Sequence, residues 1–326
     1  MKLLIIGGTV FLGRHLVESA LRRGHEITLF NRGQHNPDLF PEVQKIHGDR
    51  DGGLEPLAGK QWDAVIDTCG YVPRVVRSSA EYLAVSVEHY TFISTISVYM
   101  EPLLPGTDES APVGKLKDER VEEITGETYG PLKALCEQVV EQTFPGRSLI
   151  IRPGLIVGPQ DPSDRFTYWP WRVAHGGEVL APSSPERQVQ IIDVRDLADW
   201  TLNMVAKKAS GVYNATGPAT PLTLGSLLST CRQVSGSDAS FTWISDEFLL
   251  KNNVTPYTEL PLWLPEKDAA WEMVNIQKAL KAGLMFHSVA QTVRDTLEWD
   301  RTRPADEVRR NGLAPEREAT LLKAVK

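Results

Sequence analysis

The sequence predicts an α/β protein with a doubly wound, largely parallel sheet and a smaller C-terminal lobe. The first half of the chain alternates short apolar runs with amphipathic stretches, a rhythm typical of βαβ units. With 326 residues, of which 41% are hydrophobic and 24% charged, the chain has enough apolar side chains for a large core. Beyond Arg152 the pattern loosens into Pro-rich and aromatic sequence, which favours a second lobe.

The expected elements alternate regularly as far as residue 151. Strands are expected at 2–6, 26–30, 43–46, 64–66, 90–94 and 148–151, and helices at 12–22, 75–84 and 129–143. Later strands at 189–194 and 211–215 and a helix at 197–205 predict that the chain returns to the sheet, which then has six or more strands. The sheet domain therefore comprises residues 1–153 and 187–216, and the lobe comprises residues 154–186 and 217–326.

The bulk composition argues against several classes of protein. A net charge of −7 and an isoelectric point near 5.6 disfavour nucleic-acid binding, since no basic patch stands out. Neither the three cysteines nor the seven histidines show a metal-ligand spacing, so no metal site is expected. The apolar run at 3–6 is too short for a signal sequence or a membrane span. We therefore expect a cytoplasmic protein without membrane contact.

A glycine-rich turn joins the first expected strand to the first helix. Residues 2–13 read KLLIIGGTVFLG, so a buried strand runs directly into two glycines and the helix that follows. Glycines let the backbone approach a pyrophosphate closely, and free N–H groups at a helix N-terminus stabilise its negative charge. The turn therefore predicts a dinucleotide site, the alternative being a turn that needs glycines for packing alone. Its expected contacts are Gly7, Gly8, Thr9, Phe11, Leu12 and Gly13.

The residues after the second expected strand favour NADP over NAD. An NAD site usually has an acidic residue about 20 positions beyond the glycines, which bonds the ribose 2′-hydroxyl. This chain has Asn31 and Arg32 there instead. A guanidinium makes charge-assisted bonds to a 2′-phosphate, so we expect NADP, with NAD as the alternative. Asp49 and Arg50 follow the third strand, where Asp49 either bonds the adenine amine or is an ordinary turn aspartate.

Three polar residues form a candidate catalytic set. Thr95 follows the strand at 90–94, so its hydroxyl emerges at the sheet edge, where it would position a substrate oxygen. Tyr129 and Lys133 are four residues apart and share one helix face. A free phenol loses its proton only near pH ~10, so Tyr129 needs a neighbouring ammonium to act as a base near neutral pH. Lys133 would also hold the cofactor's ribose. The alternative is a surface Tyr–Lys pair on a solvated helix.

The sequence resembles the extended, atypical short-chain dehydrogenases/reductases of the NAD-dependent epimerase/dehydratase family, close to the isoflavone-reductase-like and chloroplast stem-loop-binding branch. The resemblance covers residues 1–217 and rests on six segments in this order: IGGTVFLGRHLV, FISTISVY, YGPLK, IRPGLIVGPQDPSDRF, QIIDVRDLA and YNATGP. It implies a Rossmann domain that binds the cofactor, a substrate lobe, and a homodimer. It also implies catalytic roles for Thr95, Tyr129 and Lys133, and cofactor contacts at Gly7, Gly8, Gly13, Arg32 and Asp49.

Three features depart from the family pattern. Val10 replaces the middle glycine of the turn. No asparagine occurs between Asn36 and Asn203, so the family's relay asparagine has no counterpart. The segment DTCGYVP at 67–73 replaces the usual Asn-Ala phrase at that strand end. The resemblance therefore also allows a member that keeps the cofactor without catalysis.

Candidate substrate contacts lie near the expected nicotinamide end. They are Tyr71, Arg165, Trp169 and Arg187, because aromatic rings with arginines suit a flat or anionic ligand. The alternative is that Trp169 helps to build the lobe's core and that Arg165 pairs with a nearby aspartate. Asp193 is expected to cap the following helix or to orient Arg195.

The sequence thus supports three functions, ranked in this order. The first is an NADP-dependent oxidoreductase that acts on a hydroxyl or carbonyl substrate by Tyr-Lys-assisted hydride transfer. The second is a sugar-nucleotide epimerase/dehydratase with a tightly held cofactor. The third is a non-catalytic dinucleotide-binding regulatory or RNA-associated protein, which the acidic composition disfavours.

Overall fold

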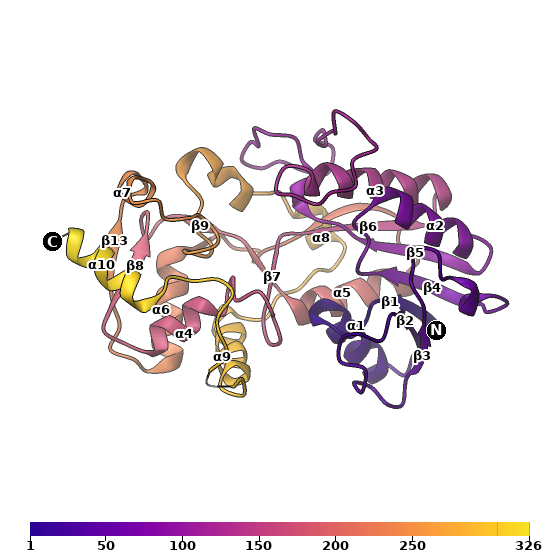
Figure 1. The fold of residues 1–326 in the computed structure, drawn as a ribbon, viewed down its shortest axis with the longest axis horizontal. Helices are drawn as coiled ribbons and strands as arrows, with labels where there is room; N and C mark the ends of the chain where they lie inside the picture. The colour runs from indigo at the N-terminus through magenta and orange to yellow at the C-terminus, as the bar shows by residue number, and fades with distance from the viewer. Residues whose placement is uncertain (305, 326) are drawn as a thin grey trace.

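A parallel sheet of seven strands forms the larger of two lobes (Figure 1). The computed structural model describes residues 1–304 and 306–325. Every neighbouring pair of strands in the sheet runs parallel. The strand order is β3–β2–β1–β4–β5–β6–β11, with β1 at Lys2–Ile6, β2 at Glu26–Asn31, β3 at Gln44–His47, β4 at Trp62–Asp67, β5 at Val87–Ile93, β6 at Ser148–Pro153 and β11 at Gly211–Ala215.

The strand order reverses direction between β1 and β4. From β1 the chain moves outward through β2 to β3, then crosses back to β4 and continues the other way. Doubly wound folds bind ligands at this switch point, beyond the carboxyl ends of the strands. The turn after β1 and the residues that follow β4 and β5 therefore meet where a ligand is expected.

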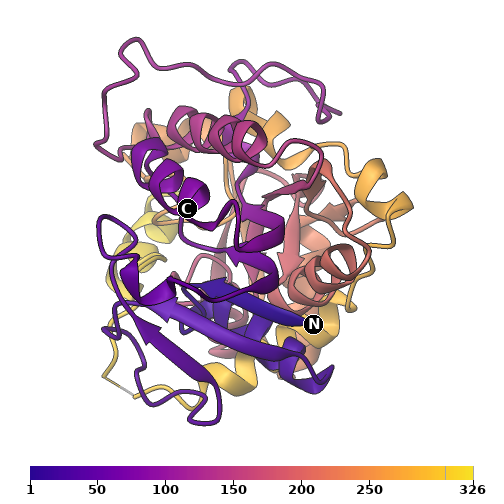
Figure 2. The same ribbon diagram turned by 90° about the vertical axis from the view of Figure 1, so that its right-hand side faces the viewer.

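Helices cover both faces of the sheet. Strand β1 is apolar on both sides: Leu3 and Ile5 pack with α1 (Phe11–Arg22) and α5 (Val194–Ala206), whereas Leu4 and Ile6 pack with α2 (Pro73–Leu83) and α3 (Tyr129–Thr143). Figure 2 shows α2 and α3 side by side on one side of the strands. A strand that is buried on both faces loses the alternation of polar residues, which explains the continuous apolar run of β1.

The smaller lobe is built from short strand pairs and helices around a second core that contains the fully buried Trp169 and Trp263. The strand pairs are β7 (Leu155–Val157) with β10 (Ile191–Asp193), β8 (Glu178–Pro182) with β13 (Ser240–Ile244), and β9 (Gln188–Val189) with β12 (Leu222–Thr223). The helices are α4 (Tyr168–Ala174), α6 (Leu224–Ser235), α7 (Asp246–Lys251), α9 (Val289–Asp300) and α10 (Pro315–Val325), while α8 (Gln277–Lys281) packs against β11. Three short 3-10 helices complete the fold: η1 (Glu55–Leu57), η2 (Ile96–Val98) and η3 (Glu266–Glu272).

The predicted fold class is confirmed, and one expected strand is corrected. The expected bounds of β1, α3 and β11 coincide with those in the structure. The run expected as one strand at 189–194 is broken at Gln190, and neither half joins the central sheet. At this residue the backbone N–H donates to the Glu272 carboxylate at 2.5 Å, and the side-chain amide bonds the backbone N–H and C=O of Val274 at 3.0 Å each. Within the described residues, no helix combines the length and the apolar character needed to cross a membrane.

Candidate active site

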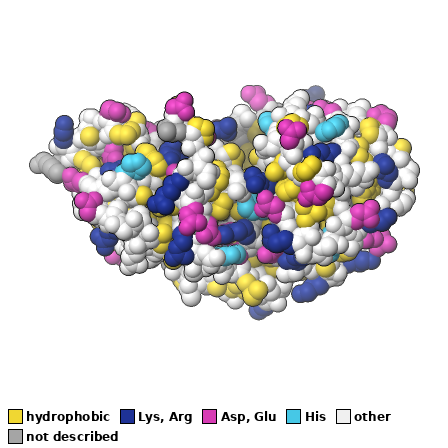
Figure 3. Space-filling view, turned by 90° about the horizontal axis from the view of Figure 1, so that it is seen from below, with side chains coloured by type: hydrophobic (Ala, Val, Ile, Leu, Met, Phe, Trp, Pro, Cys, Tyr) yellow, Lys and Arg dark blue, Asp and Glu magenta, His cyan; other side chains and the backbone are white. Residues whose placement is uncertain are grey.

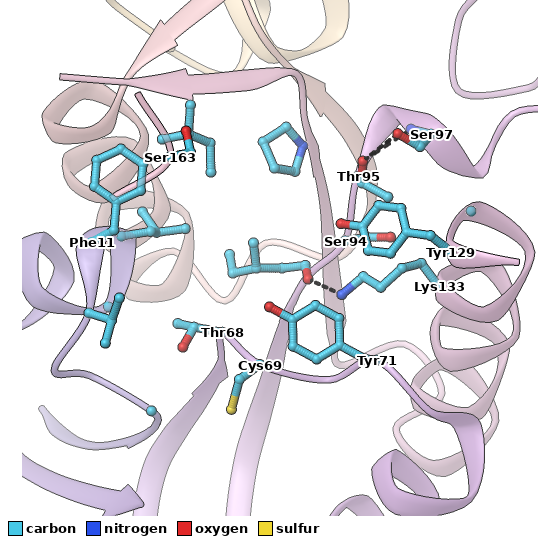
Figure 4. A pocket seen from close by; sticks show the side chains of 18 of the residues that line it. Phe11, Thr68, Cys69, Tyr71, Ser94, Thr95, Ser97, Tyr129, Lys133 and Ser163 are labelled. Atoms are coloured by element: carbon cyan, nitrogen blue, oxygen red, sulfur yellow. Dashed lines mark hydrogen bonds between the residues drawn. The ribbon is translucent and has the colours of Figure 1, made fainter. Parts of the chain in front are cut away.

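A cavity of about 1400 Å³ lies between the two lobes, at the switch point of the sheet. The residues just beyond the carboxyl ends of β1, β2, β4 and β5 line it from the larger lobe. Residues of the smaller lobe and of the long segment between η2 and α3 line the opposite side. Figure 4 shows side chains of the cavity lining that follow β4 and β5, among them Thr68 and Thr95, together with Ser163 of the smaller lobe.

The glycine turn has a backbone that only glycines adopt easily. Gly7 and Gly8 have φ angles of +105° and +93°. A Cβ at Gly13 would lie 2.8 Å from the backbone nitrogen of Gly8, so the helix can approach the turn only with glycine there. Gly7, Gly8, Thr9, Phe11, Leu12 and Gly13 all line the cavity.

The N-terminus of α1 is free to meet an anion. Its N-cap, Val10, has no side-chain hydrogen bond to the helix, and no acidic residue occupies the first turn. Val10 lines the cavity and is 44% exposed, so its side chain is not packed into the interior of the turn. The first N–H groups of the helix therefore have no side-chain competitor for a phosphate group. This arrangement suits a pyrophosphate.

Asn31 and Arg32, at the end of β2, have different environments. Asn31 donates its Nδ2 hydrogen to the Gly7 carbonyl at 3.1 Å and accepts the Gly33 N–H at 2.9 Å, so it fixes the loop. Arg32 lines the cavity, is exposed, and has no acidic partner among the described residues. Its guanidinium is thus available to a ligand. Asp49 also lines the cavity, and one of its oxygens accepts the N–H of Asp51 at 3.0 Å.

Arg50 lines the cavity, and its guanidinium is paired with a buried carboxylate. Its two Nη atoms donate to the buried carboxylate of Asp67 at 2.7 and 2.8 Å, and Nη2 also donates to Ser79 at 2.7 Å. Burial alone raises the pKa of Asp67. The charge and hydrogen bonds of Arg50, with further bonds from Tyr90 and the Cys69 N–H, outweigh burial and hold that pKa below its usual value. The guanidinium is therefore committed to an internal ion pair.

The structure brings Thr95, Tyr129 and Lys133 together at the cavity (Figure 4). Thr95 caps η2 by accepting the Ser97 N–H at 3.1 Å, and this fixes its hydroxyl beside the end of β5. Burial raises the pKa of Tyr129, while the Thr95 hydroxyl and the charge of Arg165 act in the opposite direction. The phenol therefore carries its proton at neutral pH.

Lys133 is anchored to the ends of two loops. Its Nζ donates to the carbonyls of Gly70 at 2.6 Å and Ile93 at 2.7 Å, and the residue is only 2% exposed. An ammonium group has three hydrogens, so one remains for a further acceptor. Burial lowers the pKa of Lys133 to about 8. Tyr71 lies beside it, with its ring centroid 5.3 Å from Nζ and 6.5 Å from the ring of Tyr129.

The candidate substrate contacts separate into two groups. Tyr71 and Arg165 line the cavity. Trp169 and Arg187 do not, which corrects their expected role. Trp169 is fully buried in the lobe's core, where its Nε1 donates to the Pro261 carbonyl at 2.7 Å. Arg187 pairs instead with two acidic residues of the lobe, Asp246 at 3.3 Å and Glu266 at 2.7 Å.

Two cavity residues were not anticipated from the sequence. Ser94 is 4% exposed, and its hydroxyl has no hydrogen-bond partner in the described chain. Glu272 lies at the end of η3, about 140 residues beyond Lys133 along the chain, in a segment without a recognisable motif. The Ser-Thr pair at 94–95 offered a weak signal for Ser94. No signal in the sequence pointed to Glu272.

A cluster of Asp193, Asp196 and His287 lies outside the cavity, with potential ligand atoms within 4.8 Å of one another. Both oxygens of Asp193 bond Arg195, at 2.9 and 2.7 Å, and Asp193 also caps α5, as expected. Asp196 accepts hydrogen bonds from the backbone and ring of His287. Because a guanidinium already neutralises Asp193, these contacts stabilise the junction of α5 and α9 and do not form a metal centre.

Comparisons with known proteins agree with the architecture and with the family that the sequence resembles. A family model described as the NAD dependent epimerase/dehydratase family matches residues 3–216. The chloroplast stem-loop binding protein of 41 kDa b from Arabidopsis thaliana is 26% identical over 260 residues, which make up 72% of this chain and 63% of that protein. This chain therefore spans less than two thirds of that relative's length.

Solved structures share the fold at low sequence identity. UDP-glucuronic acid 4-epimerase from Bacillus cereus, in complex with NAD, has a TM-score of 0.67 at 15% identity, over 92% of this chain and 99% of that one. UDP-glucose 4-epimerase from Thermotoga maritima, with UDP-glucose, has a TM-score of 0.67 at 17% identity, over 92% and 99% of the two chains. At these identities the likeness concerns the fold alone.

Proposed function

Because the chain belongs to the NAD-dependent epimerase/dehydratase family, we propose that it is an NADP-dependent oxidoreductase acting on a hydroxyl or carbonyl substrate. The proposal rests on the observation that two sets of residues line one cavity. The glycine turn and the unpaired Arg32 lie in the same cavity as Thr95, Tyr129 and Lys133. A dinucleotide site and a proton donor are thus within one ligand's reach.

The cofactor would be held mainly by backbone and by Arg32. The free N–H groups at the start of α1 would bind its pyrophosphate, and the guanidinium of Arg32 would bind a 2′-phosphate. The third hydrogen on Lys133 Nζ would bind its ribose. When bound, a nicotinamide dinucleotide supplies a hydride donor or acceptor. The neutral Asn31 in place of an acidic residue supports NADP over NAD.

Tyr129 would hold the proton that the reaction moves. In the reductive direction its Oη donates that proton to the oxygen developing negative charge on the substrate, and in the oxidative direction it accepts the proton. Thr95 would donate a hydrogen bond to the same oxygen and so orient it. Lys133, with a pKa of about 8, is positively charged at neutral pH and favours the phenolate that remains after proton transfer.

Substitution of Tyr129 tests the proposal directly. The protein is mixed with NADPH and a panel of carbonyl compounds, and cofactor oxidation is followed by absorbance. We expect Tyr129→Phe to lower kcat at least 100-fold with little change in NADPH affinity, because only the transferable proton is removed. Tyr82→Phe, on α2 and away from the cavity, is the matched control. Equal rates for Tyr129→Phe and the unmodified protein would contradict the assignment.

A second candidate is a sugar-nucleotide epimerase/dehydratase, which the family membership and the fold shared with UDP-sugar epimerases favour. Such an enzyme reduces and reoxidises its cofactor within one turnover. It would therefore retain cofactor through purification and convert a UDP-sugar without consuming added NADPH. Absence of retained cofactor and of UDP-sugar conversion would exclude this candidate.

The third candidate, a non-catalytic RNA-associated protein, is supported by the name of the chloroplast relative. The net negative charge of this chain disfavours RNA binding. The net charge is −7, and the face in Figure 3 intersperses basic and acidic side chains. RNA binding of this kind would require a salt-sensitive gel shift at sub-micromolar protein.

A further inference from the structure

Glu272 presents a buried carboxyl group at the cavity side of the smaller lobe. It is 5% exposed and lines the cavity together with Tyr257 and Trp271. Its Oε1 accepts the Tyr257 hydroxyl at 2.7 Å, and its Oε2 accepts the Gln190 N–H at 2.5 Å. Gln190 is itself clamped to Val274 by two side-chain bonds. The carboxyl group is therefore held in one orientation from two sides.

This carboxyl group keeps acceptor capacity that the protein does not use. A carboxylate offers about four acceptor positions, and the hydrogen bonds from Tyr257 and Gln190 occupy two of those on Glu272. No Lys, Arg or His of the described chain lies within ion-pair distance of it. An acidic group buried without a cation is costly to the fold, and such groups concentrate at functional sites. Burial raises its pKa to about 7, so part of the population is neutral near physiological pH.

Arg165 provides the positive charge on the same side of the cavity. It lines the cavity between β7 and α4, and its Nε donates only to Ser163, at 3.2 Å. It has no acidic partner within ion-pair distance in the described chain. Other arginines of the lobe are committed to ion pairs: Arg172, Arg187, Arg303, Arg309 and Arg317.

The charge of Arg165 acts on two phenols of the cavity lining, Tyr129 and Tyr257. Burial raises the pKa of Tyr129 and of Tyr257, the hydrogen-bond partner of Glu272, and the charge of Arg165 partly offsets both rises. Arg165, Tyr129 and Glu272 all line the same cavity, so one ligand in it can meet all three side chains.

We propose that this end of the cavity binds a small polyhydroxylated substrate with a single anionic group, which Arg165 pairs while Glu272 accepts hydrogen bonds from the hydroxyls. The assignment rests on the proposed function, because the reacting carbon must face Tyr129. A nucleoside diphosphate carries two adjacent negative phosphates instead of one. The smaller lobe contributes one unpaired guanidinium to the cavity lining, and its buried acid would repel a second phosphate.

The test measures ligand binding to the full chain saturated with NADP. D-Glucose 6-phosphate, D-gluconate, D-glucose and UDP-glucose are titrated separately by calorimetry. We expect D-glucose 6-phosphate or D-gluconate to bind at least tenfold more tightly than D-glucose and UDP-glucose. The affinities of the two charged ligands show whether a phosphate or a carboxylate is preferred. Arg165→Gln should remove that tenfold preference, whereas Glu272→Gln should weaken the charged and the neutral hexose alike.

Matched variants separate local from general effects. Arg301→Gln and Glu247→Gln change the same charges at exposed positions that do not line the cavity, and they should leave all affinities unchanged. The assignment is overturned if UDP-glucose binds most tightly, if neither charged hexose binds, or if Arg165→Gln behaves like Arg301→Gln. Because Arg165 is exposed, its variant keeps the test valid even if Glu272→Gln fails to fold. Failure of the unmodified protein to bind NADP would instead overturn the proposed function.

Discussion

Arg32 is the residue on which the choice of cofactor depends. It is an exposed cavity residue with no acidic partner among the residues that the structure describes, and the neighbouring Asn31 is hydrogen-bonded within the loop. A hydrogen bond to a charged group contributes about 1.5–3 kcal/mol, which corresponds to roughly 10- to 100-fold in affinity. We expect Arg32→Gln to weaken NADPH binding by that factor and to change NADH binding less than threefold. Fluorescence titration with both cofactors measures this.

The control for this substitution is Arg301→Gln, which removes an equal charge far from the cavity lining. It corrects for any general effect of net charge on anion binding. If Arg32→Gln weakened both cofactors equally, the guanidinium would contact a phosphate that NAD and NADP share.

Local motifs made some site residues predictable and left others hidden. Tyr129 and Lys133 are four residues apart on one helix, so their common face follows from helix geometry alone. Glu272 reaches the cavity only through the folding of the smaller lobe, which short motifs do not encode. The prediction for Trp169 was wrong because a run of aromatic residues looks the same in the sequence whether it binds a ligand or fills a core. The ion pair of Arg50 was not predictable from local sequence either, because its partner, Asp67, lies 17 positions later, at the end of β4.

At the scale of elements, the approach of α1 to the glycine turn depends on Gly13. An added Cβ would meet the Gly8 backbone nitrogen at 2.8 Å, and backbone atoms cannot rotate away as a side chain can. We expect Gly13→Ala to destabilise the protein by about 1–3 kcal/mol and to weaken NADPH binding at least tenfold, since helix and turn must separate. Urea unfolding and fluorescence titration measure the two effects.

Gly126→Ala is the matched control, because a Cβ at Gly126 has no atom within 4 Å and its φ is not in the left-handed region. It should leave the free energy of unfolding close to that of the parent protein. Unchanged NADPH binding in Gly13→Ala would mean that the phosphates do not depend on the close contact between α1 and the turn.

Elements with strong local patterns were predictable, and elements shaped by distant contacts were not. Strand β1 and helix α3 have the expected bounds because a buried apolar run and a regular helical face define them. The run at 189–194 has the composition of a single strand. At its break, Gln190 bonds Val274, more than 80 positions later in the chain. Contacts of that separation are invisible to local periodicity.

At the scale of the whole molecule, the cavity exists because the chain crosses between its two lobes several times. Strands β7 and β10 pair beyond the sheet, while α5 and β11 return to it, so both lobes share covalent connections around the site (Figure 1). Arg195 bonds Asp193 and Asp295 and thereby joins α5 to α9 of the smaller lobe. The composition predicted two lobes, but the placement of one against the other depends on these long-range polar contacts.

The buried carboxyl of Glu272 links the stability of the whole molecule to pH. Burial raises its pKa from 4.5 to about 7, so the folded protein holds this proton more tightly than the unfolded chain between those values. The contribution of Glu272 to the free energy of unfolding is therefore complete below pH ~4.5 and declines as the pH rises to ~7, by about 3 kcal/mol in total. Urea unfolding at pH 5, 6, 7 and 8 measures the decline. Other groups also titrate over this range, so the comparison is with Glu272→Gln, which cannot ionise. Stability should fall by about 3 kcal/mol more in the parent than in the variant; parallel curves would mean that this carboxyl is ionised in the folded protein throughout.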